Sequence, residues 1–293
     1  MASFDASKLF SIKGMVYVIT GGGSGLGETM ALALNANGAS KVFILGRREA
    51  SLNKVAAQAE AGSIIPVVCD ISSKDSLQAA VSAIGEQTPF VNVVIANGGV
   101  LGTATSFLPR SDDMTVVDLA NQLWSTPASD QQSVMNINVL GSYNTLLAFV
   151  KLLDAGNKHP NSPKANGYLQ SQFITISSAA AFIGAETVSY EYDTSKAAIL
   201  HLTKMLAAQF AKFDIRVNCI APGYFATEMT EIMHQGKDPS APGSMPKSMI
   251  PATRSGSKED LAGTLLYLTS RAGSFCTGTV IAVDGGMSFA GRM

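Results

Sequence analysis

Short apolar runs alternate along the chain with longer stretches in which apolar residues recur at helical spacing. The runs are rich in Val and Ile and are as long as buried strands; they are Met15–Thr20, Lys41–Leu45, Ile64–Cys69, Val91–Ala96, Phe173–Ser177, Ile215–Ile220 and Thr279–Val283. Between them, helical patterns include Gly25–Asn37, Ser51–Glu60 and Ser76–Ile84. This alternation predicts an α/β protein with a doubly wound, mostly seven-stranded parallel sheet and helices on both faces. Ligands of such sheets bind at the carboxyl ends of the strands.

Three segments interrupt the alternation. Gly102–Asp130 is polar and contains turn residues, and Lys158–Gly167 is rich in Pro and Asn, as exposed loops are. Glu228–Pro251 is too long for a bare connector, and segments of that kind are usually lids or binding loops. We therefore expect a substrate lid at about residues 224–251. Neither an internal repeat nor a dividing linker is found, which predicts a single domain over residues 1–293.

The composition narrows the range of partners. The 21 basic and 22 acidic residues are well mixed, so no basic field exists to hold a polyanion, and nucleic acid is not an expected partner. The three cysteines are scattered without a C-x-x-C motif, which predicts reduced thiols and offers no metal site. No run approaches the ~18 apolar residues of a membrane span. The opening residues lack a signal-peptide core, and we expect a cytoplasmic protein without membrane contact.

A cluster of glycines follows the first apolar run. Thr20–Gly27 reads T-G-x-x-x-G-x-G, with Gly21, Gly25 and Gly27 at the fixed positions, and a helical pattern comes next. Glycines there allow a tight turn and a close approach of the backbone to a pyrophosphate, which the first N–H groups of the helix can bind. The alternative is a turn without a ligand. The strand–loop–helix context favours a dinucleotide site.

The stretch Ser189–Lys196, SYEYDTSK, offers two tyrosines for chemistry. On a helix, Tyr192 and Lys196 lie one turn apart on the same face, whereas Tyr190 is about 120° from Lys196. A nearby ammonium lowers the pKa of a phenol towards working pH, which makes the phenol an effective proton donor or acceptor. Tyr192 is thus the predicted acid. Tyr190 is expected to border the substrate pocket or a subunit contact.

Eight spaced motifs, taken in order, resemble those of the short-chain dehydrogenase/reductase family over roughly Phe10 to Gly286. They are Thr20-Gly21-x-x-x-Gly25-x-Gly27, Asp70 after the third strand, Ala96-Asn97-Gly98-Gly99, Asn138-Val139-x-Gly141, Ser177-Ser178, Tyr192-x-x-x-Lys196, Pro222-Gly223-x-x-x-Thr227 and Val283-Asp284-Gly285-Gly286. The third departs from the family's N-N-A-G, because Ala96 and Gly98 replace its first Asn and its Ala. The resemblance implies a Rossmann-type fold, a nicotinamide cofactor and interconversion of a ketone and a secondary alcohol.

The resemblance also assigns site residues. Asn138, Ser178, Tyr192 and Lys196 would be catalytic, with Ser178 binding the carbonyl oxygen and Asn138 holding a water that links Lys196 to solvent. Ser177 is the less suitable hydroxyl because it should point to the opposite face of the strand. Asn138 could instead be a structural residue. The cofactor residues would be Gly21, Ser24, Gly25, Leu26, Gly27, Arg47, Arg48, Asp70, Ile71, Asn97, Gly98, Gly99, Tyr192, Lys196, Pro222, Gly223, Phe225 and Thr227.

The end of the second strand indicates which dinucleotide is used. An NAD-selective site needs a carboxylate there, but Leu45 is followed by Gly46, Arg47 and Arg48. Arginines at this point can pair with a 2′-phosphate, which favours NADP(H). Two solvated arginines are the alternative, and Ser24 stands where some NADP-dependent relatives carry another basic residue.

The substrate is predicted more coarsely than the reaction. The lid contains Met229, Ile232, Met233, Met245 and Met249, and flexible Met-rich walls suit an apolar ligand, although they could also be packing within the lid. The chain most resembles 3-oxoacyl reductases and fungal reductases of secondary metabolism, which implies an apolar oxoacyl or polyketide-like ketone. A non-catalytic dinucleotide sensor or scaffold and a C=C reductase remain alternatives.

The resemblance also implies a homotetramer or a homodimer. The subunits would meet through two long helices, Gln131–Leu153 and Tyr192–Lys212, and through the last strand.

Overall fold

The protein is described from a computed structural model. The structure describes residues 4–59, 62–108, 110–164, 167–227 and 238–290. The part of the expected lid at residues 228–237 lies outside these ranges.

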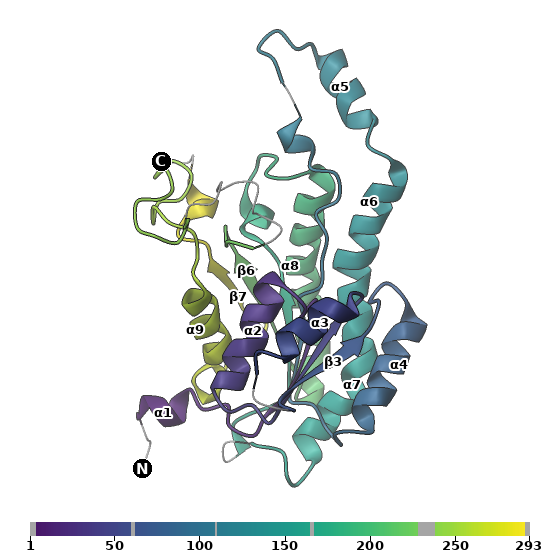
Figure 1. The fold of residues 1–293 in the computed structure, drawn as a ribbon, viewed down its shortest axis with the longest axis vertical. Helices are drawn as coiled ribbons and strands as arrows, with labels where there is room; N and C mark the ends of the chain where they lie inside the picture. The colour runs from purple at the N-terminus through teal and green to yellow at the C-terminus, as the bar shows by residue number, and fades with distance from the viewer. Residues whose placement is uncertain (1–3, 60–61, 109, 165–166, 228–237, 291–293) are drawn as a thin grey trace.

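Seven parallel strands form one sheet in the order β3-β2-β1-β4-β5-β6-β7 (Figure 1). Their bounds are β1 Val16–Thr20, β2 Lys41–Gly46, β3 Ile64–Val68, β4 Val93–Ala96, β5 Gln172–Ile176, β6 Arg216–Pro222 and β7 Val280–Val283. The strand order doubles back at β1, so the crevice at the switch point opens beside the carboxyl ends of β1 and β4. The predicted Rossmann-type sheet is confirmed.

Helices cover both faces of the sheet because the side chains of each strand alternate between two hydrophobic clusters. Tyr17 and Ile19 of β1 belong to one cluster, and Val16 and Val18 belong to the other. The helices α2 (Gly25–Ala36), α3 (Glu49–Ala56) and α9 (Lys258–Thr269) contribute to the first cluster. The helices α4 (Lys74–Gly85), α7 (Ser142–Lys158) and α8 (Tyr190–Phe210) contribute to the second. A short α1 (Ala6–Leu9) precedes β1.

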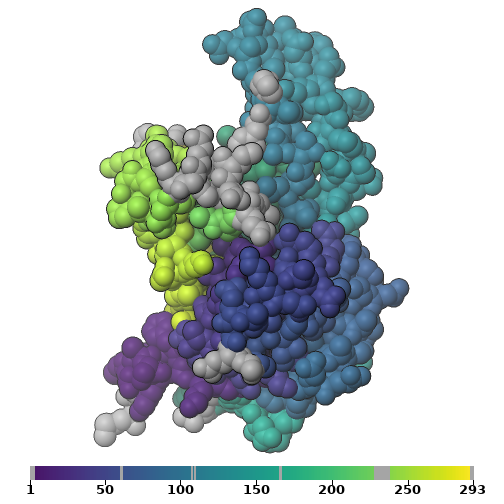
Figure 2. Space-filling view, viewed as in Figure 1, coloured from purple at the N-terminus to yellow at the C-terminus, as the bar shows by residue number. Residues whose placement is uncertain are grey.

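The segment after β4 contains two helices that the sequence analysis did not identify, η1 (Thr105–Phe107) and α5 (Val116–Trp124). They are followed by α6 (Ala128–Met135), which overlaps the start of the helix expected over Gln131–Leu153. We call residues 102–108 and 110–135 the arm; its α5 stands out from the body at the top of the view, and α6 packs beside α8 (Figures 1 and 2). A capping box starts α5: the Thr115 hydroxyl accepts from the Asp118 N–H, and the Asp118 carboxylate accepts from the Thr115 N–H.

The helix expected over Gln131–Leu153 is interrupted. A π-helical turn, η2 (Asn136–Gly141), separates α6 from α7, and Asn138 lies within it. π-turns inside helices often occur at functional sites. In the part of the chain that is described, no helix is both long enough and apolar enough to cross a bilayer.

Candidate active site

Tyr192 and Lys196 lie on the first turns of α8 and face the same cavity. The Ser189 hydroxyl caps the helix by accepting from the Tyr192 backbone N–H at 3.1 Å. The Lys196 ammonium lies 5.5 Å from the centre of the Tyr192 ring and donates to the Ile176 carbonyl, at the end of β5, at 3.1 Å. Tyr190 is exposed and does not line this cavity.

Burial governs the acid–base properties of this pair. It lowers the pKa of the Lys196 ammonium from its ordinary 10.5 to about 8, and the nearby Cys219 thiol opposes this effect. Burial also raises the pKa of the Tyr192 phenol, while a hydrogen bond with the Ser178 side chain opposes the rise and the Asp193 charge adds to it. The expected fall of the phenol pKa towards working pH is therefore not seen in this structure, because desolvation dominates.

The two serines at the end of β5 point in different directions. The Ser177 hydroxyl is buried and donates to the Lys196 carbonyl at 2.7 Å, so it fixes α8 against the strand. The Ser178 hydroxyl accepts from the Ala180 N–H at 3.2 Å and lies on the cavity side, next to the Tyr192 phenol. Both serines line the cavity, and the Ser178 side chain is the one that pairs with the Tyr192 phenol. The catalytic role of Ser178 stays a prediction.

Asn138 is buried and does not line the cavity. Its Oδ1 accepts from the Val100 N–H at 2.9 Å, and its Nδ2 donates to the Val100 carbonyl and the Ser195 hydroxyl, both at 3.0 Å. The Ser195 hydroxyl donates in turn to the Tyr192 carbonyl at 2.7 Å. Asn138 therefore joins the loop after β4 to the first turn of α8. Its predicted water-holding role stays a prediction, and these contacts support the structural alternative.

The glycine loop is tied to the end of β4. The Thr20 hydroxyl accepts from the N–H groups of Asn97 and Gly98, at 3.0 and 2.9 Å. The Asn97 Nδ2 donates to the carbonyls of Thr20 and Gly21, at 3.0 and 3.1 Å. Gly21 has φ of 65°, and a Cβ there would lie 2.8 Å from the Gly98 Cα. Only glycine fits this crossing, which leaves the backbone open to a ligand.

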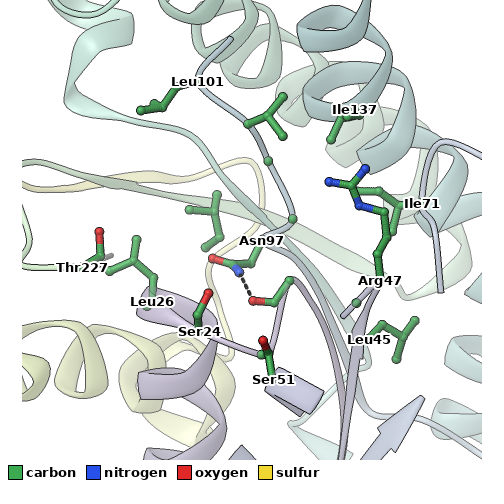
Figure 3. A pocket seen from close by; sticks show the side chains of 18 of the residues that line it. Ser24, Leu26, Leu45, Arg47, Ser51, Ile71, Asn97, Leu101, Ile137 and Thr227 are labelled. Carbon is green, nitrogen blue, oxygen red and sulfur yellow. Dashed lines mark hydrogen bonds between the residues drawn. The ribbon is translucent and has the colours of Figure 1, made fainter. Parts of the chain in front are cut away.

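One cavity of about 650 Å³ collects nearly all of the predicted site residues. Ser24, Leu26 and Thr227 lie on one side of Asn97, and Arg47 and Ile71 lie on the other (Figure 3). Gly27 and Asn138 are the predicted residues that do not line it. A Cβ on Gly27 would lie 2.1 Å from the Gly21 carbonyl oxygen, so the lack of a side chain at Gly27 allows α2 to pack closely against the glycine loop.

The cavity also includes residues that sequence reasoning missed. They are Gly23, Leu45, Gly46, Ser51, Leu52, Cys69, Val100, Leu101, Ile137, Ile176 and Ser177. Most of them are direct chain neighbours of predicted site residues. This adjacency is the feature of the sequence from which they could have been predicted. Thr20 was missed as the residue that ties the glycine loop to β4, although it is part of the glycine motif.

Cationic and hydroxyl groups gather at the end of β2. Arg47 and Arg48 are exposed at the cavity, and the Arg48 guanidinium donates to the Ser24 hydroxyl at 3.4 Å. Asp70 accepts from the N–H and the hydroxyl of Ser72, which holds the pKa of its carboxyl below the ordinary value, with Arg47 adding to the effect. Within the described ranges, no cluster of three or more His, Cys, Asp or Glu side chains is arranged to hold a metal ion.

Comparison with known proteins agrees with this geometry. A family model described as enoyl-(acyl carrier protein) reductase matches residues 21–288. The short-chain dehydrogenase/reductase VdtF of Byssochlamys spectabilis is 40% identical, over 97% of this chain and 96% of its own. The chain belongs to the short-chain dehydrogenase/reductase family. It is therefore an oxidoreductase, and the family resemblance found in the sequence is confirmed.

Solved members of the short-chain dehydrogenase/reductase family share the fold. The Pseudomonas aeruginosa RhlG/NADP active-site complex superimposes with a TM-score of 0.75 at 27% identity, covering 96% of this chain and 98% of its own. The 3-ketoacyl-(acyl-carrier-protein) reductase from Brucella melitensis complexed with NADH gives a TM-score of 0.73 at 26% identity, covering 95% and 100%. Both are complexes with a nicotinamide dinucleotide, NADP in one and NADH in the other.

Proposed function

We propose that this protein is an NADP(H)-dependent carbonyl reductase in which Tyr192 transfers the proton. The observation that carries the proposal is the convergence of Ser178, Tyr192 and Lys196 in one cavity at the carboxyl end of β5. The reverse reaction, oxidation of a secondary alcohol, would use the same groups. The cofactor is a nicotinamide dinucleotide, as in the solved relatives.

The residues present fit such a dinucleotide. The glycine loop would hold the pyrophosphate, because a side chain at Gly21 would close the crossing with Gly98. Asp70 and Ile71 would lie at the adenine, and Asn97, Gly98 and Gly99 would line its path towards Lys196. Arg47, Arg48 and the hydroxyls of Ser24 and Ser51 supply donors suited to a 2′-phosphate, which favours NADP(H) over NAD(H).

The bound dinucleotide supplies the hydride that the carbonyl carbon receives. The hydroxyls of Ser178 and Tyr192 would donate hydrogen bonds to the carbonyl oxygen, where negative charge develops. The Tyr192 phenol then gives its proton to that oxygen and completes the alcohol. The phenolate that remains is stabilised by the Lys196 ammonium, whose pKa of about 8 keeps it charged at neutral pH.

The substrate would be an apolar oxoacyl or polyketide-like ketone. Leu101, Ile137 and Phe225 give the cavity apolar walls. The lid proposed for residues 224–251 begins at the cavity, where Phe225 pairs with Gly256 in an isolated bridge. A Cβ on Gly256 would lie 2.3 Å from the Phe225 ring, so this glycine lets the ring lie flat against the backbone. Met245 and Met249 of the lid are half-buried.

We also propose that the protein forms a homo-oligomer, a tetramer or a dimer. Leu140, Tyr143 and Leu147 are exposed at helical spacing along η2 and α7, and Met205 is exposed on α8. A row of this kind is typical of helices that pair across subunits. Light scattering of the purified protein would measure the mass, and a monomer at micromolar concentration would overturn this assignment.

Reduction of a C=C bond is the second candidate. The description of the matching family model, enoyl reductase, favours it. In a C=O reductase the acid–base group must reach the carbonyl oxygen itself. The hydroxyls of Ser178 and Tyr192 lie next to each other, so both could donate hydrogen bonds to one carbonyl oxygen. We therefore rank carbonyl reduction first.

Absorbance at 340 nm tests the proposed function. NADPH or NADH is mixed with a β-ketoester, a 3-oxoacyl thioester mimic, a diketone or a polycyclic quinone, and Tyr192→Phe is run beside the parent. We expect NADPH oxidation with at least one ketone, lost in the variant. Tight binding of NADPH without turnover on any of them would instead favour a sensor or scaffold.

A further inference from the structure

The base of the arm is fastened to the loop that precedes α8. The Ser106 N–H donates to the Val188 carbonyl at 3.0 Å, and the Ser106 hydroxyl donates to the Thr187 carbonyl at 3.1 Å. The Thr105 hydroxyl and the Arg110 guanidinium both donate to the Glu186 carboxylate. Among the described residues, four hydrogen bonds thus join residues 105–108 and Arg110 to residues 186–188.

The carboxylate of Glu186 is the central acceptor of this junction. Its side chain is 4% exposed, whereas that of Arg110 is 38% exposed. A carboxylate so deeply buried depends on its partners, because water cannot replace them. Thr105, the other donor, is itself buried. Loss of the Arg110 cation would leave a buried negative charge with a single hydroxyl donor, and the loop would have to open to hydrate it.

The same loop is fastened to the catalytic turn of α8. Thr187 donates its N–H and its hydroxyl to the two carboxylate oxygens of Asp193, at 2.7 and 2.6 Å. Asp193 follows Tyr192 in the chain, and Ser189 caps the Tyr192 N–H. The junction therefore continues from Arg110 through Glu186 and Thr187 to the residue beside the proposed acid. Figure 1 shows the base of the arm above the start of α8.

The junction also reaches the cavity wall. The Ser189 hydroxyl donates to the carbonyl of Leu101, a lining residue, at 3.5 Å. The Thr103 hydroxyl donates to the Asp130 carboxylate of α6 at 2.8 Å. This bond links the first residues of the arm to the helix at its end. One set of bonds thus holds both the start of the arm and the turn that presents Tyr192.

We propose that Glu186 is a positioning residue for the reaction, and that its pair with Arg110 makes the geometry of Tyr192 depend on the arm. This inference rests on the proposed function, since it concerns the placement of the proton donor. A shift of about 1 Å in a catalytic group can cost up to ~10²-fold in rate. The predicted cofactor residues that follow β1, β2 and β4 make no hydrogen bond in this junction, so binding of the dinucleotide at those residues should not change.

The test combines kinetics with amide hydrogen exchange in four variants of the full chain. Arg110→Ala removes the cation, Arg110→Lys keeps it, Glu186→Gln removes the buried charge, and the double variant Arg110→Ala/Glu186→Gln removes both. Lys158→Ala is the control, because it breaks an exposed Lys158–Asp154 ion pair at the far end of α7. Each variant is assayed with NADPH and the ketone that the parent reduces best.

We expect Arg110→Ala to lower kcat about 10- to 100-fold while the KM for NADPH stays within twofold. Exchange in residues 184–193 should become faster. Arg110→Lys and the double variant should recover most of the loss, because the first restores a cation and the second leaves no unpaired buried charge. Lys158→Ala should match the parent. A purely structural pair would lower the melting temperature of Arg110→Ala but leave its kcat unchanged, and that result would overturn the proposal.

Failure of the proposed function would be recognised separately. A parent that reduces no ketone would reject the carbonyl reductase, and exchange in residues 184–193 would then decide on the junction. If the parent reduces no ketone, unchanged amide exchange of residues 184–193 in Arg110→Ala would still overturn the positioning role of Glu186.

Discussion

Lys196 and Arg216 lie at opposite ends of the same sheet, and both carry a positive charge into the interior. Lys196 is 6% exposed beside the carboxyl end of β5, and Arg216 is 3% exposed at the start of β6. In the described part of the chain, neither cation forms a salt bridge with a carboxylate. Burial lowers the pKa of both groups, to about 8 for Lys196 and about 10 for Arg216.

The two cations differ in what their N–H groups bind. Arg216 donates to the carbonyls of Leu268, Gly273 and Cys276 and to the Gln172 side chain, so it secures the loop between α9 and β7. Lys196 donates to a single carbonyl, that of Ile176, and borders the cavity with donors to spare. Both cations are buried at a cost in free energy, but Arg216 has a structural role at the start of β6 and Lys196 has a proposed catalytic role at the end of β5.

The largest effect is expected when the cation at the cavity is removed. Lys196→Met should lower kcat/KM by about 10³-fold, within the range for loss of an acid–base group. It should not destabilise the protein at pH 7, because methionine fills a buried site without the cost of a charge. Kinetics and urea unfolding of the same sample measure both quantities. A fall in stability that parallels the fall in activity would make Lys196 a structural residue like Arg216.

The opposite result is expected for Arg216→Met. This change leaves the buried carbonyls of Leu268, Gly273 and Cys276 without their donor, which should lower the free energy of unfolding by about 2–4 kcal/mol. The kcat of the folded protein should stay within twofold. Urea unfolding and active-site titration with NADPH measure the two effects. A loss of kcat at unchanged stability would contradict the structural assignment.

Lys196 should also make stability depend on pH. Between about pH 8 and 10.5 the unfolded chain holds a proton on Lys196 that the folded protein has lost, so stability should rise with pH there. The rise is at most about 3 kcal/mol. Below about pH 8 both states are protonated and the burial cost is constant. Urea unfolding from pH 7 to 10.5 should show a steeper rise in the parent than in Lys196→Met; equal slopes would show that Lys196 titrates normally.

The smallest effect concerns an exposed cation. Arg47→Ala should lower kcat/KM for NADPH about 10-fold and leave that for NADH nearly unchanged, because the contact with a 2′-phosphate is partly solvated. Steady-state kinetics with the two cofactors measure the ratio. Equal losses with NADPH and NADH would show that Arg47 does not select the 2′-phosphate.

Local patterns predicted the parts of this structure that depend on neighbours in the chain. The strands followed from runs of Val and Ile, and the choice of Ser178 over Ser177 followed from strand alternation. Features that depend on distant segments were missed. The π-turn at Asn138 is anchored by Val100 and Ser195, and the donors of Arg216 reach residues more than 50 positions away. Desolvation of Tyr192, which overturned its expected pKa, is likewise a property of the packed fold.

The most direct test of carbonyl reduction follows the hydride. NADPH carrying two deuterium atoms at C4 of the nicotinamide is incubated with an α,β-unsaturated ketone, in the parent and in Tyr192→Phe, and the product is analysed by mass spectrometry and NMR. Our account predicts an unsaturated alcohol with deuterium on the carbinol carbon, formed by the parent and lost in the variant. A saturated ketone with deuterium on its β-carbon would show C=C reduction and contradict the assignment of Ser178 and Tyr192 to the carbonyl oxygen.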